Sequence, residues 1–190
     1  MIFEIGATIF GLLQGIFVVF NKRIHWIFYI FQMCSLILFS YLNKLYGDMS
    51  NSAFYLLVGI VGFILWNPKR GNQAITTCSL REKILYSLLI LLGTISLYFL
   101  LKQTDDPLPV MDSFTTVSSL VATYYMVRRK IDTWLIWFIN DICYVIQYAL
   151  LPQPAFYLLS LNVIWTLLAV LSYYQWQKIM KEFNHEKQIK

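Results

Sequence analysis

Residues 133–150 have the sequence TWLIWFINDICYVIQYAL, and they determine how the rest of the chain is interpreted. At about 100° per residue, the polar and aromatic side chains share one arc of roughly 140°. These residues are Trp134, Trp137, Asn140, Asp141, Tyr144, Gln147 and Tyr148. The rest of the surface is apolar, which predicts a membrane helix with one lipid-facing side. A carboxylate and an amide near mid-membrane are costly unless paired or hydrated, so this helix is a candidate binding site.

The composition agrees with a membrane setting. Of the 190 residues, 58% are hydrophobic and 13% charged, with a mean hydropathy of +0.60. Each hydrophobic run is roughly long enough to cross a ~30 Å hydrocarbon core as a helix. The runs are 3–20, 24–43, 52–66, 84–101, 112–127, 133–150 and 155–176. We therefore expect an all-α integral membrane protein with seven transmembrane helices and a single transmembrane domain over 1–190. Glu4 lies at the start of the first run, where a signal peptide would be basic, so we expect that helix to be retained.

Charge placement predicts the orientation. With seven spans, the loops 21–25, 67–83 and 128–132 and the C-terminal tail share one side and hold 13 of the 15 Lys and Arg. Lys44 and Lys102 lie on the other side, with the acidic Glu4, Asp48, Asp105 and Asp106. The positive-inside rule puts the C-terminus in the cytoplasm and the N-terminus outside, in a cell membrane. The net charge of +5 therefore needs no nucleic-acid partner.

Motifs for catalysis or metal binding are missing from the sequence. Cys34 and Cys143 fall inside predicted spans, and His25 and His185 have no Cys or carboxylate at ligand spacing. No glycine-rich phosphate loop or Ser/His/Asp set is present. We therefore expect no metal, no cofactor and no enzymatic activity.

The two ends of the chain follow one plan. Each has a helix, a short basic loop, a helix opened by Trp, an outer loop and a helix closed by Trp. The corresponding pairs are Trp26 with Trp134, Tyr29 with Trp137, Gln32 with Asn140, and Trp66 with Trp176. The first three pairs have the same offset along the chain, and the offset of the last pair is nearly the same. With 84–101 as a linker helix, this predicts parallel repeats over 3–66 and 112–176, a 3+1+3 arrangement.

Parallel repeats usually enclose a site near the bilayer midplane. In the fifth span a small and polar seam contains Asp112, Thr115, Thr116, Ser119, Ala122, Thr123 and Met126. In the seventh, one side is shared by Asn162, Thr166, Ala169 and Tyr173, with Trp165 beside them. The predicted substrate contacts are Gln32, Asp112, Ser119, Trp134, Trp137, Asn140, Asp141, Tyr144, Asn162 and Trp165.

Simpler roles remain open for each of them. Trp26, Trp66, Trp134 and Trp176 fit an aromatic belt at the membrane interface. The Ser and Thr side chains can bond to their own helix, and the amides can bridge helices. Asp141 can be a buried structural carboxylate and Asp112 an N-cap. Gly11-x-x-x-Gly15 is typical of helix packing.

The chain resembles the Pnu family of vitamin transporters. The shared features are the 3+1+3 plan, Trp134-x-x-Trp137 followed by Asn140, Asp112 at the head of the fifth span, and Gly62-x-x-x-Trp66. The sequence is short for that family, so we expect no extra N-terminal helix, and it carries Asp141 beside Asn140. The resemblance implies a fold similar to full-length SWEET transporters and a homotrimer. By motif, it also implies that Trp134, Trp137 and Asn140 contact substrate.

The resemblance further implies facilitated diffusion of a nucleoside-like vitamin, typically nicotinamide riboside, which a cytosolic kinase traps by phosphorylation. Thiamine, riboflavin and deoxynucleosides are the alternatives within the family. A planar base can stack on an indole, and a cationic ring gains cation–π attraction. Two other classes remain open: a vitamin-binding subunit of an energy-coupling transporter, and a membrane enzyme using Asp112 and Asp141.

Overall fold

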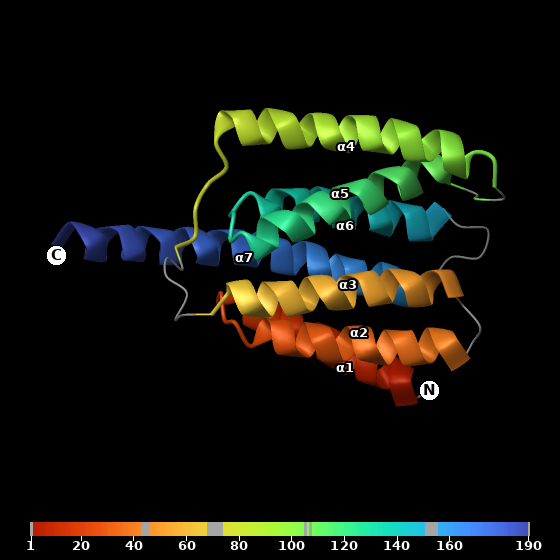
Figure 1. Cartoon of the computed structure of the whole chain (residues 1–190), viewed down its shortest axis with the longest axis horizontal. Coiled ribbons are helices and arrows are strands. Elements are labelled where there is room, and N and C mark those ends of the chain that lie inside the picture. The colour runs from red at the N-terminus through yellow and green to blue at the C-terminus, as the bar shows by residue number, and fades with distance from the viewer. Residues whose placement is uncertain are drawn as a thin grey trace. The chain divides into compact units, whose positions relative to one another are not determined.

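The computed structural model describes residues 2–42, 46–67, 74–104, 106, 108–150 and 156–189. The described helices are α1 Ile2–Val19, α2 His25–Leu42, α3 Tyr46–Leu65, α4 Leu80–Leu101, α5 Pro109–Val127, α6 Thr133–Leu150 and α7 Phe156–Ile189 (Figure 1). They form two compact units, Met1–Gln73 and Ala74–Lys190. Predictions that concern Lys44, Lys69, Arg70, Asp105 and Lys190 lie outside the described residues, as do those on the side chains of Glu4, Asp48, Tyr148 and Lys187.

Local sequence signals explain where the helices begin and end. The helix α6 has the bounds predicted from its periodicity. By contrast, α4 starts at Leu80, ahead of the predicted span, because a capping box satisfies its first turn: Glu82 N donates to Ser79 Oγ (3.2 Å) and Ser79 N to Glu82 Oε2 (2.7 Å). Pro109 opens α5 at its first position, where a missing N–H costs nothing. Hydropathy thus marks the apolar part of a helix and misses its polar ends.

In the first unit, α2 contacts both α1 and α3. Two glycines of α3 allow this close approach: a Cβ at Gly62 would lie 2.5 Å from the ring of Trp26, and one at Gly59 would lie 2.8 Å from that of Tyr29. On α1, a Cβ at Gly11 would lie 2.7 Å from Gln32 Nε2. Gly11 therefore acts in helix packing, as its motif indicated, and Gln32 lies against it.

In the second unit, α6 contacts both α5 and α7, while α4 packs on α5. Gly93 of α4 lies against Val117, with 2.8 Å from an added Cβ to Val117 Cγ1. Tyr86 lies over Tyr124 and Tyr125 at centroid distances of 5.3 and 5.0 Å. Every residue of α4 remains at least partly exposed, so α4 is held to its unit along one side only.

The turn after α1 and the turn after α5 have the same backbone geometry. Asn21 and Arg129, which are related by the same offset as Trp26 and Trp134, both adopt a left-handed conformation, with φ of 52° and 53°. The next residue in each case donates to a carbonyl five positions back: Lys22 N to Phe17 O (3.1 Å) and Lys130 N to Tyr125 O (2.9 Å). Both are Schellman-type helix ends. The spacing that relates the two halves of the sequence therefore also relates two equivalent turns.

The four tryptophans of the repeated pattern form two matching pairs. Trp26 meets Trp66 at 5.6 Å and 89°, and Trp134 meets Trp176 at 5.2 Å and 87°, both edge to face. All four indoles are buried. An aromatic belt would leave these rings at the surface, so that interpretation is wrong for them, and their contribution is to packing within each unit.

By length and hydropathy, one helix among the described residues, α4, qualifies as a membrane span. The stretches Ile5–Val19, His25–Leu38 and Ser52–Leu65 are apolar but shorter. This number is below the predicted seven, and in α5 and α6 the polar residues of the buried face lower the average hydropathy. All seven helices nevertheless carry exposed large apolar side chains, as expected of surfaces that meet lipid.

Candidate functional site

The two faces predicted for α6 are present in the structure. On the apolar side, Leu135 and Ile139 are exposed. On the polar side, the exposed fractions are 4% for Trp134, 0% for Asn140 and 5% for Asp141. The amphipathic pattern of residues 133–150 therefore corresponds to an outward apolar face and an inward polar one.

The amide of Asn140 joins α6 to α5. Its Nδ2 donates to Thr115 O and to Ser118 Oγ, both at 3.0 Å. The bridging role that the sequence left open for this amide is thus present. Ser118 was missed because it lies just outside the seam predicted for the fifth span, although its spacing of three from Thr115 places both on neighbouring parts of one helix face.

The contacts on α5 also fix which end of the amide faces it. A backbone carbonyl such as Thr115 O only accepts, and the hydroxyl of Ser118 already donates to Phe114 O (2.6 Å). Both neighbours of Asn140 therefore require a donor, so the NH₂ group must face α5. Asn140 Oδ1 is left buried and without a partner among the described residues.

Two neighbours of Asn140 are also unsatisfied. Within the part of the chain that the structure describes, the carboxylate of Asp141 makes no hydrogen bond or ion pair, and Trp137 Nε1 is buried without an acceptor. Positions 137, 140 and 141 follow the i, i+3, i+4 spacing of one helix face. We call Trp137, Asn140 and Asp141 the α6 site. Buried unpaired polar groups are rare, so the two at Trp137 and Asn140, next to the Asp141 carboxylate, indicate a bound ligand or water.

The structure places the other predicted contacts on α2, α5, α6 and α7. Ser119 bonds back to Thr116 O of its own helix at 2.8 Å. Asp112 is the fourth residue of α5 and the N-cap is Leu108, so the N-cap interpretation of Asp112 is wrong. Among the remaining predicted contacts, Tyr144, Asn162 and Trp165 are half-buried on α6 and α7, and Gln32 belongs to the first unit.

The predicted seam of α5 is partly correct. Thr115, Ser119, Ala122 and Thr123 are buried as expected, whereas Asp112, Thr116 and Met126 remain half-buried. Ser113 and Ser118 are also fully buried, and by helix geometry they flank the predicted arc on its two sides. The face that α5 presents inward is therefore wider than the predicted arc.

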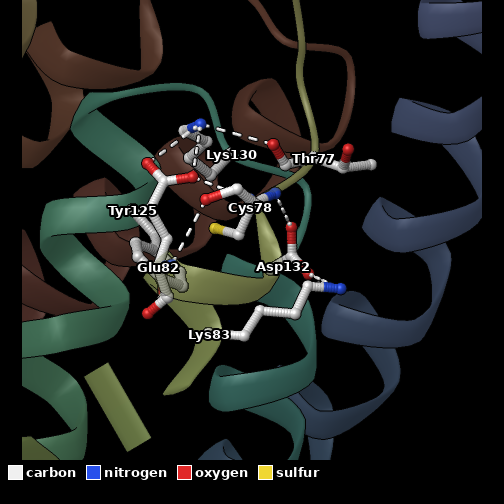
Figure 2. A network of polar contacts seen from close by, with 8 residues as sticks. Thr77, Cys78, Glu82, Lys83, Tyr125, Lys130 and Asp132 are labelled. Atoms are coloured by element: carbon white, nitrogen blue, oxygen red, sulfur yellow. Dashed lines mark hydrogen bonds and ion pairs between the residues drawn. The ribbon is translucent and has the colours of Figure 1, made fainter. Parts of the chain in front are cut away.

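A second polar cluster lies where the segment before α4 runs beside the turn between α5 and α6. Thr76 N donates to Arg129 O (3.1 Å) and Ile131 N to Thr76 O (2.9 Å), forming an isolated parallel bridge. Figure 2 shows Asp132 between Cys78 and Lys83: its Oδ2 accepts from Cys78 N at 2.7 Å and its Oδ1 pairs with Lys83 Nζ at 2.9 Å. The Asp132 carboxylate thus binds both the segment before α4 and the first turn of α4.

Lys130 makes a further link in the same cluster. Its Nζ lies 3.3 Å from the Glu82 carboxylate and donates to Thr77 O at 3.3 Å (Figure 2). From the sequence, Lys130 was assigned to the basic cytoplasmic loop alone, and this network was not found, because its members lie far apart along the chain. The cluster fixes the start of α4 and the start of α6 relative to each other within the second unit.

The exposed apolar side chains of the helices and the buried polar face of α6 together define the class of protein. It is a helical membrane protein in which one helix turns a polar face inward. The chain belongs to the nicotinamide mononucleotide transporter family, whose model matches residues 1–178. It is therefore a member of a family of transporters.

Individual relatives agree with this assignment. The chain is 27% identical to a nicotinamide riboside transporter PnuC from Neisseria mucosa, over 94% of this chain and 73% of that protein. It is 24% identical to the protein of the same name from Haemophilus influenzae, over 73% of this chain and 62% of that protein. It also resembles the crystal structure of a vitamin B3 transporter PnuC, with a TM-score of 0.73 and 25% identity over 93% of this chain and 81% of that one.

Proposed function

We propose that the protein carries nicotinamide riboside across the cell membrane by facilitated diffusion. The observation that carries this proposal is the α6 site, where an indole, an amide oxygen and a carboxylate share one helix face, and where Trp137 Nε1 and Asn140 Oδ1 have no hydrogen-bond partner among the described residues. The two relatives that are named nicotinamide riboside transporters support the choice of substrate.

The chemistry of the site suits a cationic nucleoside. The pyridinium ring stacks on Trp137, where it gains cation–π attraction. Asp141 supplies the counter-charge, which offsets the cost of a carboxylate inside the membrane. Asn140 Oδ1 accepts a hydrogen bond from the ligand. Both acceptors of the α6 site are then paired with the ligand.

The same site disfavours a phosphorylated substrate. The family model is named for the mononucleotide, but neither Pro109–Val127 nor Thr133–Leu150 contains a Lys or Arg. A phosphate placed near Asp141 would meet repulsion with no nearby cation on these two helices. We therefore propose that the riboside crosses and that a cytosolic kinase traps it as the mononucleotide.

The proposed architecture is a 3+1+3 arrangement of seven spans similar to full-length SWEET transporters. Repeats over 3–66 and 112–176, joined by the linker helix 84–101, are supported by the equivalent turns at Asn21 and Arg129 and by the two tryptophan pairs. The basic loops place the C-terminus in the cytoplasm and the N-terminus outside. By likeness to the Pnu family, the assembly is a homotrimer.

A ligand panel tests the choice of substrate. Purified protein in detergent is heated with nicotinamide riboside, nicotinamide mononucleotide, thiamine, riboflavin or deoxyguanosine, and the unfolding temperature is measured. The riboside should raise that temperature most, because only a ligand bound to the folded state stabilises it. A larger rise with thiamine would favour the runner-up, a thiamine carrier, since its thiazolium ring also suits Asp141. Stabilisation by the mononucleotide equal to that by the riboside would contradict the proposal.

A further inference from the structure

We propose that α5 sets the orientation of the Asn140 amide so that its oxygen selects a carboxamide on the ligand ring and rejects a carboxylate. The inference rests on the proposed function and goes beyond it, because it names the group that the site recognises. Ser118 and the Thr115 carbonyl then act as positioning groups, and Asn140 Oδ1 contacts the ligand.

The orientation of the amide is determined by what α5 offers. Turning the amide over would put Asn140 Oδ1 where Nδ2 now lies, 3.0 Å from Thr115 O and from Ser118 Oγ. Thr115 O has no hydrogen to give, and the Ser118 hydroxyl is engaged with Phe114 O at 2.6 Å. The flipped state loses the hydrogen bond to Thr115 O and brings two acceptors together there, and it regains a bond to Ser118 only if that hydroxyl leaves Phe114 O, so the amide keeps one orientation.

The free end of the amide is therefore an acceptor only. Asn140 is 0% exposed, and its Oδ1 has no partner among the residues that the structure describes. The neighbouring Asp141, 5% exposed, adds a second acceptor with a negative charge. A ligand group that enters this place must bring a donor.

The two forms of vitamin B3 riboside differ in this property. The carboxamide of nicotinamide riboside has an NH₂ group that can donate to Asn140 Oδ1. The carboxylate of nicotinic acid riboside presents only acceptors and carries a negative charge. A buried site that requires a hydrogen bond discriminates strongly against a ligand that cannot make it. The loss of affinity is far larger than the loss for a ligand that lacks one methylene group in an apolar pocket. We expect the amide form to bind roughly 100-fold more tightly or better.

The test compares the dissociation constants of the two ribosides by calorimetry on the purified full-length protein. Ser118→Ala removes one of the two acceptors that hold the amide, so the preference for the amide form should fall about tenfold. Ser113→Ala is the matched control. Ser113 is also a fully buried serine of α5, but its hydroxyl bonds to Pro109 O of its own helix (2.6 Å), so the preference should not change.

A second variant separates the contribution of the Asn140 amide to this preference from that of the Asp141 charge. Asp141→Asn removes the carboxylate that also repels the acid form, and a preference of at least about tenfold should persist from Asn140 alone. Equal affinities for the two ribosides in the wild type, or in Asp141→Asn, would overturn the inference, as would an unchanged preference in folded Ser118→Ala. Failure of nicotinamide riboside to bind the wild type at all would instead overturn the proposed function. If Ser118→Ala does not fold, the wild type and Asp141→Asn decide the question.

Discussion

The ring of Trp134 meets that of Trp176 edge to face, with centroids 5.2 Å apart and planes at 87°. Trp26 and Trp66 repeat this geometry in the first unit. The family motif Trp134-x-x-Trp137 therefore contains two indoles with different surroundings: Trp134 is buried against Trp176 of α7, whereas Trp137 is only half-buried. Among the described residues, neither indole Nε1 has a hydrogen-bond partner. Substitution of Trp134 is thus expected to lower mainly stability, and substitution of Trp137 mainly ligand affinity.

Substitution of the two indoles tests this separation. Trp134→Ala should lower the free energy of unfolding by about 3–5 kcal/mol, because a buried indole is removed. Trp137→Ala should weaken riboside binding by about 1–3 kcal/mol, the typical cost of losing an aromatic stacked on a base. Thermal unfolding and calorimetry measure the two effects. A greater loss of affinity in folded Trp134→Ala than in Trp137→Ala would place the ligand nearer Trp134.

The charge of Asp141 is expected to select cationic ligands. Asp141→Asn keeps the shape of the side chain and removes its charge, so the affinity for nicotinamide riboside should fall, while that for a neutral nucleoside such as deoxyguanosine should be spared. Both affinities should be measured on protein that elutes as a single species. If their ratio is the same in the variant and the wild type, Asp141 is a structural carboxylate.

Gly62 is expected to be essential for the packing of α3 on α2. A Cβ at this position would lie 2.5 Å from the Trp26 ring, which also meets the Trp66 ring edge to face. Gly62→Ala should destabilise the protein by about 1–3 kcal/mol. Gly6→Ala is the control, since its nearest contact would be Ser35 Oγ at 3.4 Å and alanine favours a helix by about 1 kcal/mol. Equal unfolding temperatures for the two variants would show that α3 can shift to accept the methyl group.

Thiol labelling tests the orientation of the 67–83 loop. Cys78 is a poor probe because it is buried, and burial raises its pKa to about 11 from an ordinary 9.0, so about 100-fold less of it is thiolate near neutral pH. Its reaction rate should rise with pH until the medium reaches that pKa. Thr77 is exposed, so Thr77→Cys should react faster. In intact cells an impermeant reagent should leave Thr77→Cys unmodified; rapid modification from outside would reverse the proposed topology.

Sequence periodicity was sufficient to predict the bounds and the two faces of α6. Its bounds and its two faces depend on the order of polar and apolar residues along one helix, and that order is visible in residues 133–150. The start of α4 was missed because the capping box of Ser79 and Glu82 lies in a polar segment before the apolar run. Hydropathy alone contains no information about such a cap.

Contacts between helices could not be predicted in the same way. The partnership of Asn140 with Ser118 depends on the rotation and depth of α5 against α6, which neither helix determines alone. The pairing of Asp132 with Lys83 joins residues from different segments, and Asp132 appeared in the sequence as an ordinary loop residue. The candidate helix was therefore found from the sequence, whereas the orientation of the amide within it required the structure.

Transport by protein reconstituted in liposomes tests the central claim most directly. Labelled nicotinamide riboside should enter vesicles down its own gradient, without ATP or an imposed ion gradient, and should leave again when the gradient is reversed. Trp137→Ala vesicles with equal protein content should show a much lower rate. Binding of the riboside without movement, or movement only with an imposed ion gradient, would contradict facilitated diffusion by this protein.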